Sequence, residues 1–289
     1  MTNDSFSIRL REARLMMGLS MDKLVERTNG AITKQSISRY EKGIMRPKRD
    51  ALQAIAKALN ISEAYFDGTN IKIDVPMLRT TSNGKVSEDE LQALEAKLSF
   101  WAEQYLAKEK EAGFPTQFKN PIKGTRVSTL EDAIQASSLL REKWHCGDGP
   151  IASILRLLER KGIMILAATL PDYVFGMSTW ADKKHPLMIL DFNPEKSSVE
   201  KLRFTAAHEL AHLLLLFPED SPLRLEKRCD LFAGFFLLPK LALIEELGSK
   251  KRAKITLEEM IDIKELYGAS LAASIIAARD YGIITTEYK

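Results

Sequence analysis

Two histidines and a glutamate occur at a spacing that few arrangements other than a metal site require. They lie in RFTAAHELAHLLLLF, residues 203–217, as His208, Glu209 and His212. On a helix, positions i and i+4 project from the same face one turn apart, so both imidazoles can close on one metal ion. Glu209 lies beside them and can hold a water molecule without being a ligand. The stretch therefore predicts a helix that carries two metal ligands and a general base.

A third ligand is available in the next amphipathic segment, RLEKRCDLFAGFFLLP. Glu226 and Asp230 are again four residues apart on one helical face, while apolar residues occupy the rest. Glu226 can complete a zinc site of two histidines and one glutamate, and Asp230 can accept the second ring N–H of a ligand histidine. Two other interpretations stay open: a solvated acidic edge for Glu226 and Asp230, and hydrogen-bonded core histidines for His208 and His212.

These two segments resemble the ImmA/IrrE family of zinc metallopeptidases, in which a helix of the form RFxxAHELGH is followed by ExxAN or ExxAD, then by FA and LLxP. The upstream stretches GPIASILRLLERKGIMIL, FGMSTW and PLMILDFNP are also similar to elements of that family. The sequence departs from the family at Ala211, where glycine is usual, and at Cys229, where alanine is usual; both replacements are small. The resemblance covers about residues 125–285, and the roles that it implies are zinc ligands for His208, His212 and Glu226 and the general base for Glu209.

Length and composition bound the rest of the chain. With 289 residues and 45% hydrophobic content, it can bury sizeable cores, and its length favours two domains over one. No stretch reaches roughly 18 uninterrupted apolar residues, and the N-terminus lacks the apolar run of a signal peptide, so we expect no membrane segment. The two cysteines, Cys146 and Cys229, fit a reducing cytoplasm without a disulfide framework.

The small net charge of +3 is unevenly distributed. Residues 1–69 hold 12 Lys or Arg and 8 Asp or Glu, whereas the rest of the chain is close to neutral. The basic excess lies between Lys34 and Arg49, within a framework of short helices: a turn at GLS, then DKLVERT, then KQSISRYEKG capped by Thr33. This pattern is typical of a helix-turn-helix domain, whose second helix enters the major groove of DNA.

Residues 7–68 resemble the phage-repressor or XRE class of helix-turn-helix domain, through GLSMDKL, TKQSISRYEKG and RPKRDALQAIAKALNIS. By that match the exposed side of the helix after Thr33 faces base edges, where Gln suits adenine and Arg or Lys suits guanine. The residues assigned to bases are Lys34, Gln35 and Arg39, and those assigned to phosphates are Lys42, Arg46, Lys48 and Arg49. A helical bundle that binds a protein instead of DNA remains the alternative.

The connection between the two domains is predicted to be a linker followed by a long helix. Residues 71–85 mix an extended piece with Ser, Thr, Asn and Gly, and Ser87 with Glu90 forms a capping box. The apolar stripe of that helix consists of Leu91, Leu94, Leu98, Trp101 and Tyr105. We expect this stripe to pack against the C-terminal domain, with self-association into a homodimer as the alternative.

Short strands are expected in the C-terminal domain at GIMILAA, YVFGMSTW and PLMILDF. Phe175–Trp180 is the candidate edge strand, to which a peptide substrate can add its backbone as a further strand. Thr256 with Glu259 predicts another capped helix, in a helical layer that closes the domain. Tyr267 and Tyr281 are candidates for stabilising the oxyanion, but the sequence does not show where they lie relative to the metal site.

The expected fold is mainly α with a small β-sheet, of the α+β class. Its parts are a helix-turn-helix domain at residues 1–69, a linker and long helix at 70–124, and a zincin-like metallopeptidase domain at 125–289. The expected function is that of a cytoplasmic, DNA-binding transcriptional regulator with a zinc-dependent endopeptidase domain. The expected partners are a double-stranded DNA operator and, from the family resemblance, a repressor protein as the peptidase substrate. Two alternatives are a regulator that cuts nothing, with a structural or sensory zinc site, and an antitoxin-like protein that sequesters a partner.

Overall fold

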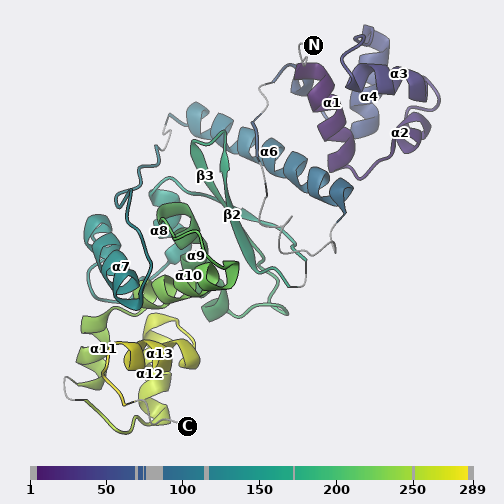
Figure 1. Ribbon diagram of the computed structural model, residues 1–289. Helices are drawn as coiled ribbons and strands as arrows, with labels where there is room; N and C mark the ends of the chain where they lie inside the picture. The colour runs from purple at the N-terminus through teal and green to yellow at the C-terminus, as the bar shows by residue number, and fades with distance from the viewer. Residues whose placement is uncertain are drawn as a thin grey trace. The chain divides into compact units, whose positions relative to one another are not determined.

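The computed structural model describes residues 5–68, 71–73, 75, 87–113, 117–171, 173–248 and 251–285. Contacts divide the chain into two compact units (Figure 1). Unit 1 comprises Met1–Pro115 with Trp180–Lys184, and unit 2 comprises Thr116–Thr179 with His185–Lys289. The described residues are mainly helical with one small sheet, which confirms the predicted α+β class. No described helix is both long and apolar enough to span a membrane.

Unit 1 begins with a cluster of short helices. They are α1 (Ser5–Met16), α2 (Met21–Arg27), α3 (Lys34–Glu41), α4 (Arg49–Leu59) and the 3-10 helix η1 (Glu63–Asp67). Ser20 caps α2 by accepting from the backbone N–H of Lys23, and Thr33 caps α3 by accepting from that of Ser36. The predicted cap at Thr33 is therefore confirmed, and it fixes where the exposed basic helix starts.

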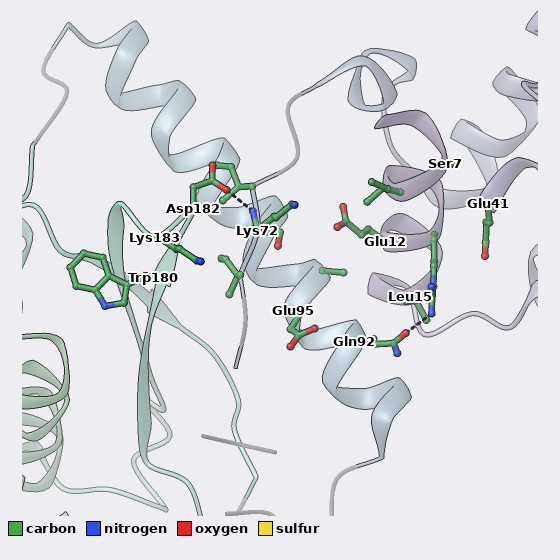
Figure 2. A pocket seen from close by; sticks show the side chains of 16 residues that line it. Ser7, Glu12, Leu15, Glu41, Lys72, Gln92, Glu95, Trp180, Asp182 and Lys183 are labelled. Carbon is green, nitrogen blue, oxygen red and sulfur yellow. Dashed lines mark hydrogen bonds between the residues drawn. The ribbon is translucent and has the colours of Figure 1, made fainter. Parts of the chain in front are cut away.

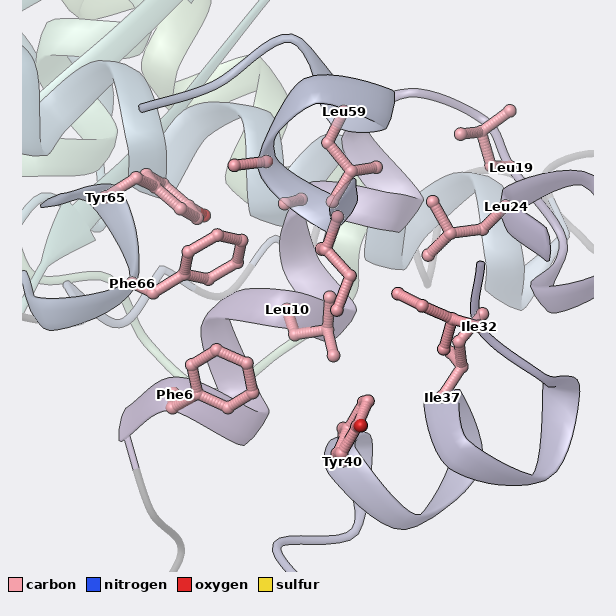
Figure 3. Close-up of a cluster of buried hydrophobic side chains, with 13 residues drawn as sticks. Phe6, Leu10, Leu19, Leu24, Ile32, Ile37, Tyr40, Leu59, Tyr65 and Phe66 are labelled. Atoms are coloured by element: carbon pink, nitrogen blue, oxygen red, sulfur yellow. The ribbon is translucent and has the colours of Figure 1, made fainter. Parts of the chain in front are cut away.

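A single apolar core joins these helices (Figure 3). Its fully buried members are contributed by every helix of the cluster, among them Leu10, Leu24, Ile37, Leu59 and Phe66. Beside the core, Arg14 of α1 forms a bidentate ion pair with Glu41 at the end of α3, with oxygens at 2.6 and 2.9 Å. The core and this buried pair hold α3 with one face inward and its basic face in solvent.

The long helix α6 (Glu88–Glu111) opens with the predicted capping box of Ser87 and Glu90. It packs along α1, where Arg9 donates to both carboxylate oxygens of Glu103 at 3.1 and 2.9 Å. These contacts attach α6 to the helix-turn-helix cluster, which differs from the expectation that the helix packs against the C-terminal domain. Of the predicted linker, residues 71–85, only 71–73 and 75 are among the described residues.

A hollow of about 840 Å³, lined by both polar and apolar residues, lies in unit 1 beside α1 and α6 (Figure 2). Two pairs of lining residues are joined by hydrogen bonds. The backbone N–H of Lys72 donates to the carboxylate of Asp182 at 2.8 Å, and the N–H of Asp182 donates to the carbonyl of Lys72 at 3.0 Å. The guanidinium of Arg11 donates to the side-chain carbonyl of Gln92 at 2.8 Å. The hollow shares no residue with the cluster of His208 and His212.

Unit 2 contains most of a three-stranded sheet, of which only Trp180 and Ala181 belong to unit 1. Its early elements are α7 (Leu130–Trp144), α8 (Ile154–Arg160), β1 (Met164–Ala167), β2 (Gly176–Ala181) and β3 (His185–Leu190). The strand order is β1-β3-β2, with β1 parallel to β3 in the register Met164↔Leu187. Strand β2 is thus an edge strand of the described sheet, as predicted for Phe175–Trp180.

The later helices of unit 2 are α9 (Val199–Leu214), α10 (Pro222–Leu237), α11 (Lys240–Leu247), α12 (Leu257–Tyr267) and α13 (Leu271–Asp280). Helix α10 packs against α7 on one side and α9 on the other, with Phe232, Phe235 and Phe236 fully buried or nearly so (Figure 1). Helix α12 starts with the predicted capping box of Thr256 and Glu259. The pairing of α9 with α10 decides where the candidate site lies.

Candidate metal centre

Helices α9 and α10 bring His208, His212 and Glu226 together. The Nε2 atoms of the two histidines are 3.1 Å apart. Oε2 of Glu226 lies 3.0 Å from Nε2 of His208, and Oε1 lies 3.6 Å from Nε2 of His212. The structure therefore places the three predicted ligands around one point, although they come from residues 18 and 14 positions apart and from two separate helices.

The donor set fits a zinc ion. The two Nε2 atoms face each other, and when both neutral rings carry their proton on Nδ1, neither Nε2 has a proton to donate to the other. A cation at their meeting point would take a lone pair from each ring and a third from the carboxylate, which is the donor set of an open zinc site. The thiol of Cys229 is also near, since one atom from each of His208, His212 and Cys229 lies within 4.8 Å of the others. Its sulfur faces the Nδ1 side of His212, so Glu226 is the better third donor at the Nε2 side.

The opposite nitrogens of the two rings are held by neighbouring residues of α10. Nδ1 of His208 is 2.8 Å from Oδ1 of Asp230, the contact that the sequence predicts for Asp230. Nδ1 of His212 is 3.8 Å from Sγ of the buried Cys229. An acceptor at Nδ1 leaves the lone pair on Nε2 for a metal. Cys229 stands out in the sequence only as a small residue in place of alanine, so its contact with His212 is not predicted from the sequence.

Glu209, the predicted base, follows His208 directly on α9 and is almost fully buried. The hydroxyl of Ser178, on β2, donates to Oε2 of Glu209 at 2.7 Å. Burial raises the pKa of Glu209, while the two histidines and the Ser178 hydrogen bond oppose that shift. The sequence does not predict this contact of Ser178, although the residue lies within the FGMSTW segment that is expected to form an edge strand.

The electrostatics of the cluster favour a cation. Burial lowers the pKa of His208, but hydrogen bonds to Asp230 and Glu226 outweigh it and raise the pKa to about 10. The same hydrogen bonds, from His208 and His212, lower the pKa of Glu226 to about 2. The carboxylate of Glu226 is therefore ionised at neutral pH, and its charge stabilises positive charge at the histidines.

The two tyrosines considered for oxyanion stabilisation are both buried. The hydroxyl of Tyr281 donates to the carbonyl of Leu238 at 3.1 Å, where it ties α13 to the end of α10. Burial is also the main cause that raises the pKa of Tyr267. These positions suit packing, so neither tyrosine is assigned to the metal centre.

The predicted DNA-contacting side chains of unit 1 all lie in solvent. They are Lys34, Gln35 and Arg39 on α3, Lys42 and Arg46 after it, and Lys48 and Arg49 at the start of α4. Lys34 forms an exposed ion pair with Asp22 of α2 at 2.7 Å, and the Arg46 guanidinium lies 5.8 Å from the Phe6 ring centroid. The basic run thus forms one exposed surface on a well-packed helical cluster.

Comparison with known families supports this part of the chain. A helix-turn-helix family matches residues 10–66, which run from within α1 to η1. The N-terminal helices therefore form a DNA-binding domain of the helix-turn-helix type. No curated protein is similar enough to the chain to count as a match.

Proposed function

We propose that the protein is a DNA-binding regulator whose C-terminal unit is a zinc-dependent endopeptidase that cuts a repressor protein. The observation that carries the proposal is the convergence of His208, His212 and Glu226 through their metal-binding atoms, with Glu209 held beside them. Three ligands and an open fourth position are typical of catalytic zinc, whereas structural zinc is closed by four protein ligands. This count also favours a catalytic site over a purely structural one.

The chain's own residues account for the proton transfers of peptide hydrolysis. A zinc ion in the site would supply a Lewis acid that polarises the peptide carbonyl and makes water acidic near neutral pH. Glu209 accepts the proton of the attacking water and passes it to the leaving amine, for which its raised pKa is suited. Ser178 holds one carboxylate oxygen of Glu209, and Asp230 and Cys229 hold the two histidine rings in orientation.

Two substitutions distinguish the proposed base, Glu209, from the proposed metal ligand, Glu226. Glu209→Gln is expected to keep the zinc content of the purified protein and to abolish cleavage, because the amide cannot accept the proton. Glu226→Ala is expected to lose most of the zinc, because it removes a ligand. Zinc is measured by elemental analysis, and cleavage on a gel with the repressor encoded nearest to the gene.

Glu219→Ala is the matched control, since Glu219 is an acidic residue in the loop before α10 and outside the cluster. It should change neither zinc content nor cleavage. Equal zinc loss in Glu209→Gln and Glu226→Ala would contradict the assignment of Glu209 as base. A wild-type protein that binds one zinc and cuts no repressor would instead support a sensory or structural role for the metal.

A further inference from the structure

An apolar groove of about 530 Å³ lies in unit 2 between α9, α10 and α13. Its walls are large apolar side chains, including Phe204, Leu231, Phe235 and Ile276, and small residues such as Ala273 leave the space between them. A volume of this size is typical of sites that hold a small ligand or a large side chain. The proposed catalytic residues do not account for this groove.

The groove lies along the same two helices as the metal cluster and shares Asp230 with its surroundings. Phe204 precedes His208 by one turn of α9, so the two share a face. On α10, Asp230 and Gly234 follow Glu226 by one and two turns on one face. Asp230 lines the groove and also holds His208 at 2.8 Å. A molecule in the groove would therefore lie next to the second sphere of the metal centre.

Gly234 indicates that the groove is kept open. It lies in the interior of α10, where glycine destabilises a helix relative to alanine. A Cβ at this position would meet no atom within 4 Å, so packing within the structure does not require glycine. A methyl group there would instead project into the groove, because Gly234 is part of its lining. Glycine at this position therefore makes α10 less stable than alanine would, but it leaves space in the groove for a bound group.

The charges at the rim define the occupant further. Each acid at the rim has a cationic or histidine partner: Asp280 pairs with Arg279 at 2.7 Å, Glu200 with Lys264 at 2.8 Å and Asp230 with His208. Lys227 is exposed and forms no hydrogen bond or ion pair with the described residues. An apolar group accompanied by a negative charge complements this surface.

We propose that the groove binds a large aliphatic or aromatic side chain of the polypeptide that is cut, close to the scissile bond, with an acidic substrate residue near Lys227. This inference rests on the proposed function, because it assigns the groove to the substrate of the same metal centre. It predicts a preference for bulky apolar residues next to the cleaved bond. The selectivity would come from Gly234 and the walls around it.

Two metal-binding compounds of equal backbone length test the proposal: N-acetyl-leucyl hydroxamate and N-acetyl-alanyl hydroxamate. Both would bind to the zinc-loaded full chain through the hydroxamate, and only the leucyl side chain would reach into the groove. We expect the leucyl compound to bind at least about tenfold more tightly by calorimetry, the discrimination usual for a few methylenes in an apolar pocket. Gly234→Leu should remove this preference and leave the affinity for acetohydroxamate unchanged.

Gly234→Ala is a milder variant with room for its methyl group, and it should raise the Tm while reducing the leucyl preference. Leu223→Ala, at a residue of α10 that is 82% exposed and outside the groove, should leave the preference unchanged. Equal affinities of the two compounds for the wild type, or a preference that survives Gly234→Leu, would overturn the proposal. If no hydroxamate binds at all, the metal centre itself is wrong and the inference falls with it.

Discussion

Ser178 is the residue through which the edge strand acts on the proposed base. Its hydroxyl donates to Oε2 of Glu209, and a hydrogen bond to a carboxylate stabilises the ionised form. Ser178→Ala should therefore raise the pKa of Glu209 further, so that a higher pH is needed to ionise the base. We expect the acidic limb of the pH–rate profile of cleavage to move to higher pH, with zinc content unchanged.

Ser178→Thr is the control for this prediction, because threonine keeps the hydroxyl and suits a strand. It should restore the acidic limb to its wild-type position. An unchanged profile in Ser178→Ala would mean that the hydrogen bond does not act on the group that titrates. A loss of zinc in the same variant would point to a general disturbance of α9.

Asp230 and Cys229 allow a comparison of two contacts to histidine at the same site. A carboxylate at 2.8 Å is a strong acceptor for Nδ1, whereas a thiol at 3.8 Å is a weak one. Asp230→Asn should lower zinc affinity by about 10- to 100-fold, the usual effect of removing such a partner. Cys229→Ala should lower it less, and Cys229→Ser should lie close to the wild type. Competition with a chelator measures all three, and a larger effect of Cys229→Ala than of Asp230→Asn would reverse the assignment.

The two predicted modes of DNA contact are carried by α3, through Arg39, and by the start of α4, through Lys48. Arg39→Ala should cost about 1 to 3 kcal/mol and relax specificity at one base pair, because arginine reads a guanine edge. Lys48→Ala should weaken binding to all sequences alike and reduce the salt dependence by about one unit, because it neutralises a phosphate. Affinities for a panel of operator variants at several salt concentrations measure both effects.

Lys57→Ala is the matched control for these substitutions, since Lys57 is an exposed cation of α4 outside the predicted set. It should affect neither specificity nor salt dependence. If Arg39→Ala and Lys48→Ala behave alike across the operator panel, direct readout by Arg39 is wrong. Lys34 is not used in this comparison, because its ion pair with Asp22 must break before its ammonium group can reach a base.

At the level of helices and strands, the sequence predicts those features that residues close together in the chain determine. The caps at Thr33, Ser87 and Thr256 follow from side chains that bond to backbone three residues away, and all three are found in the structure. The contact of Ser178 with Glu209 joins residues 31 positions apart on a strand and a helix, and no local pattern encodes it. The packing of α6 against α1 is likewise not encoded locally, because an apolar stripe shows that a helix packs but not on which neighbour.

The groove beside the metal centre could not be predicted from the sequence either. Gly234 looks in sequence like an ordinary helix residue, and only the arrangement of α9, α10 and α13 shows that its missing side chain leaves space. The convergence of His208, His212 and Glu226 could be predicted because HExxH spacing places both histidines on one helical face, and Glu226 shares a face with Asp230. The contact of Cys229 with His212 could not be predicted, because it depends on which side of the His212 ring faces α10.

At the scale of the whole molecule, one chain combines a DNA-binding domain with the proposed peptidase. Binding to DNA raises the local concentration of a tethered domain near proteins on neighbouring sites, to about the millimolar range for a short flexible connection. We therefore infer that the helix-turn-helix domain delivers the peptidase to a DNA-bound repressor. The competing hypothesis is that the chain cuts itself within the predicted linker, residues 71–85, and so separates reader from peptidase.

The two hypotheses predict different products and a different response to DNA. Delivery predicts an intact chain of 32.5 kDa, a shortened repressor, and cleavage that is faster when one DNA fragment carries the sites of both proteins. The double substitution Arg39→Ala with Lys48→Ala should remove that acceleration and leave the rate without DNA unchanged, because it touches only unit 1. Self-cleavage predicts fragments near residues 1–80 and 81–289 that need Glu209 and form at a rate independent of protein concentration. Such fragments, together with a repressor that stays intact on the shared DNA, would rule out delivery.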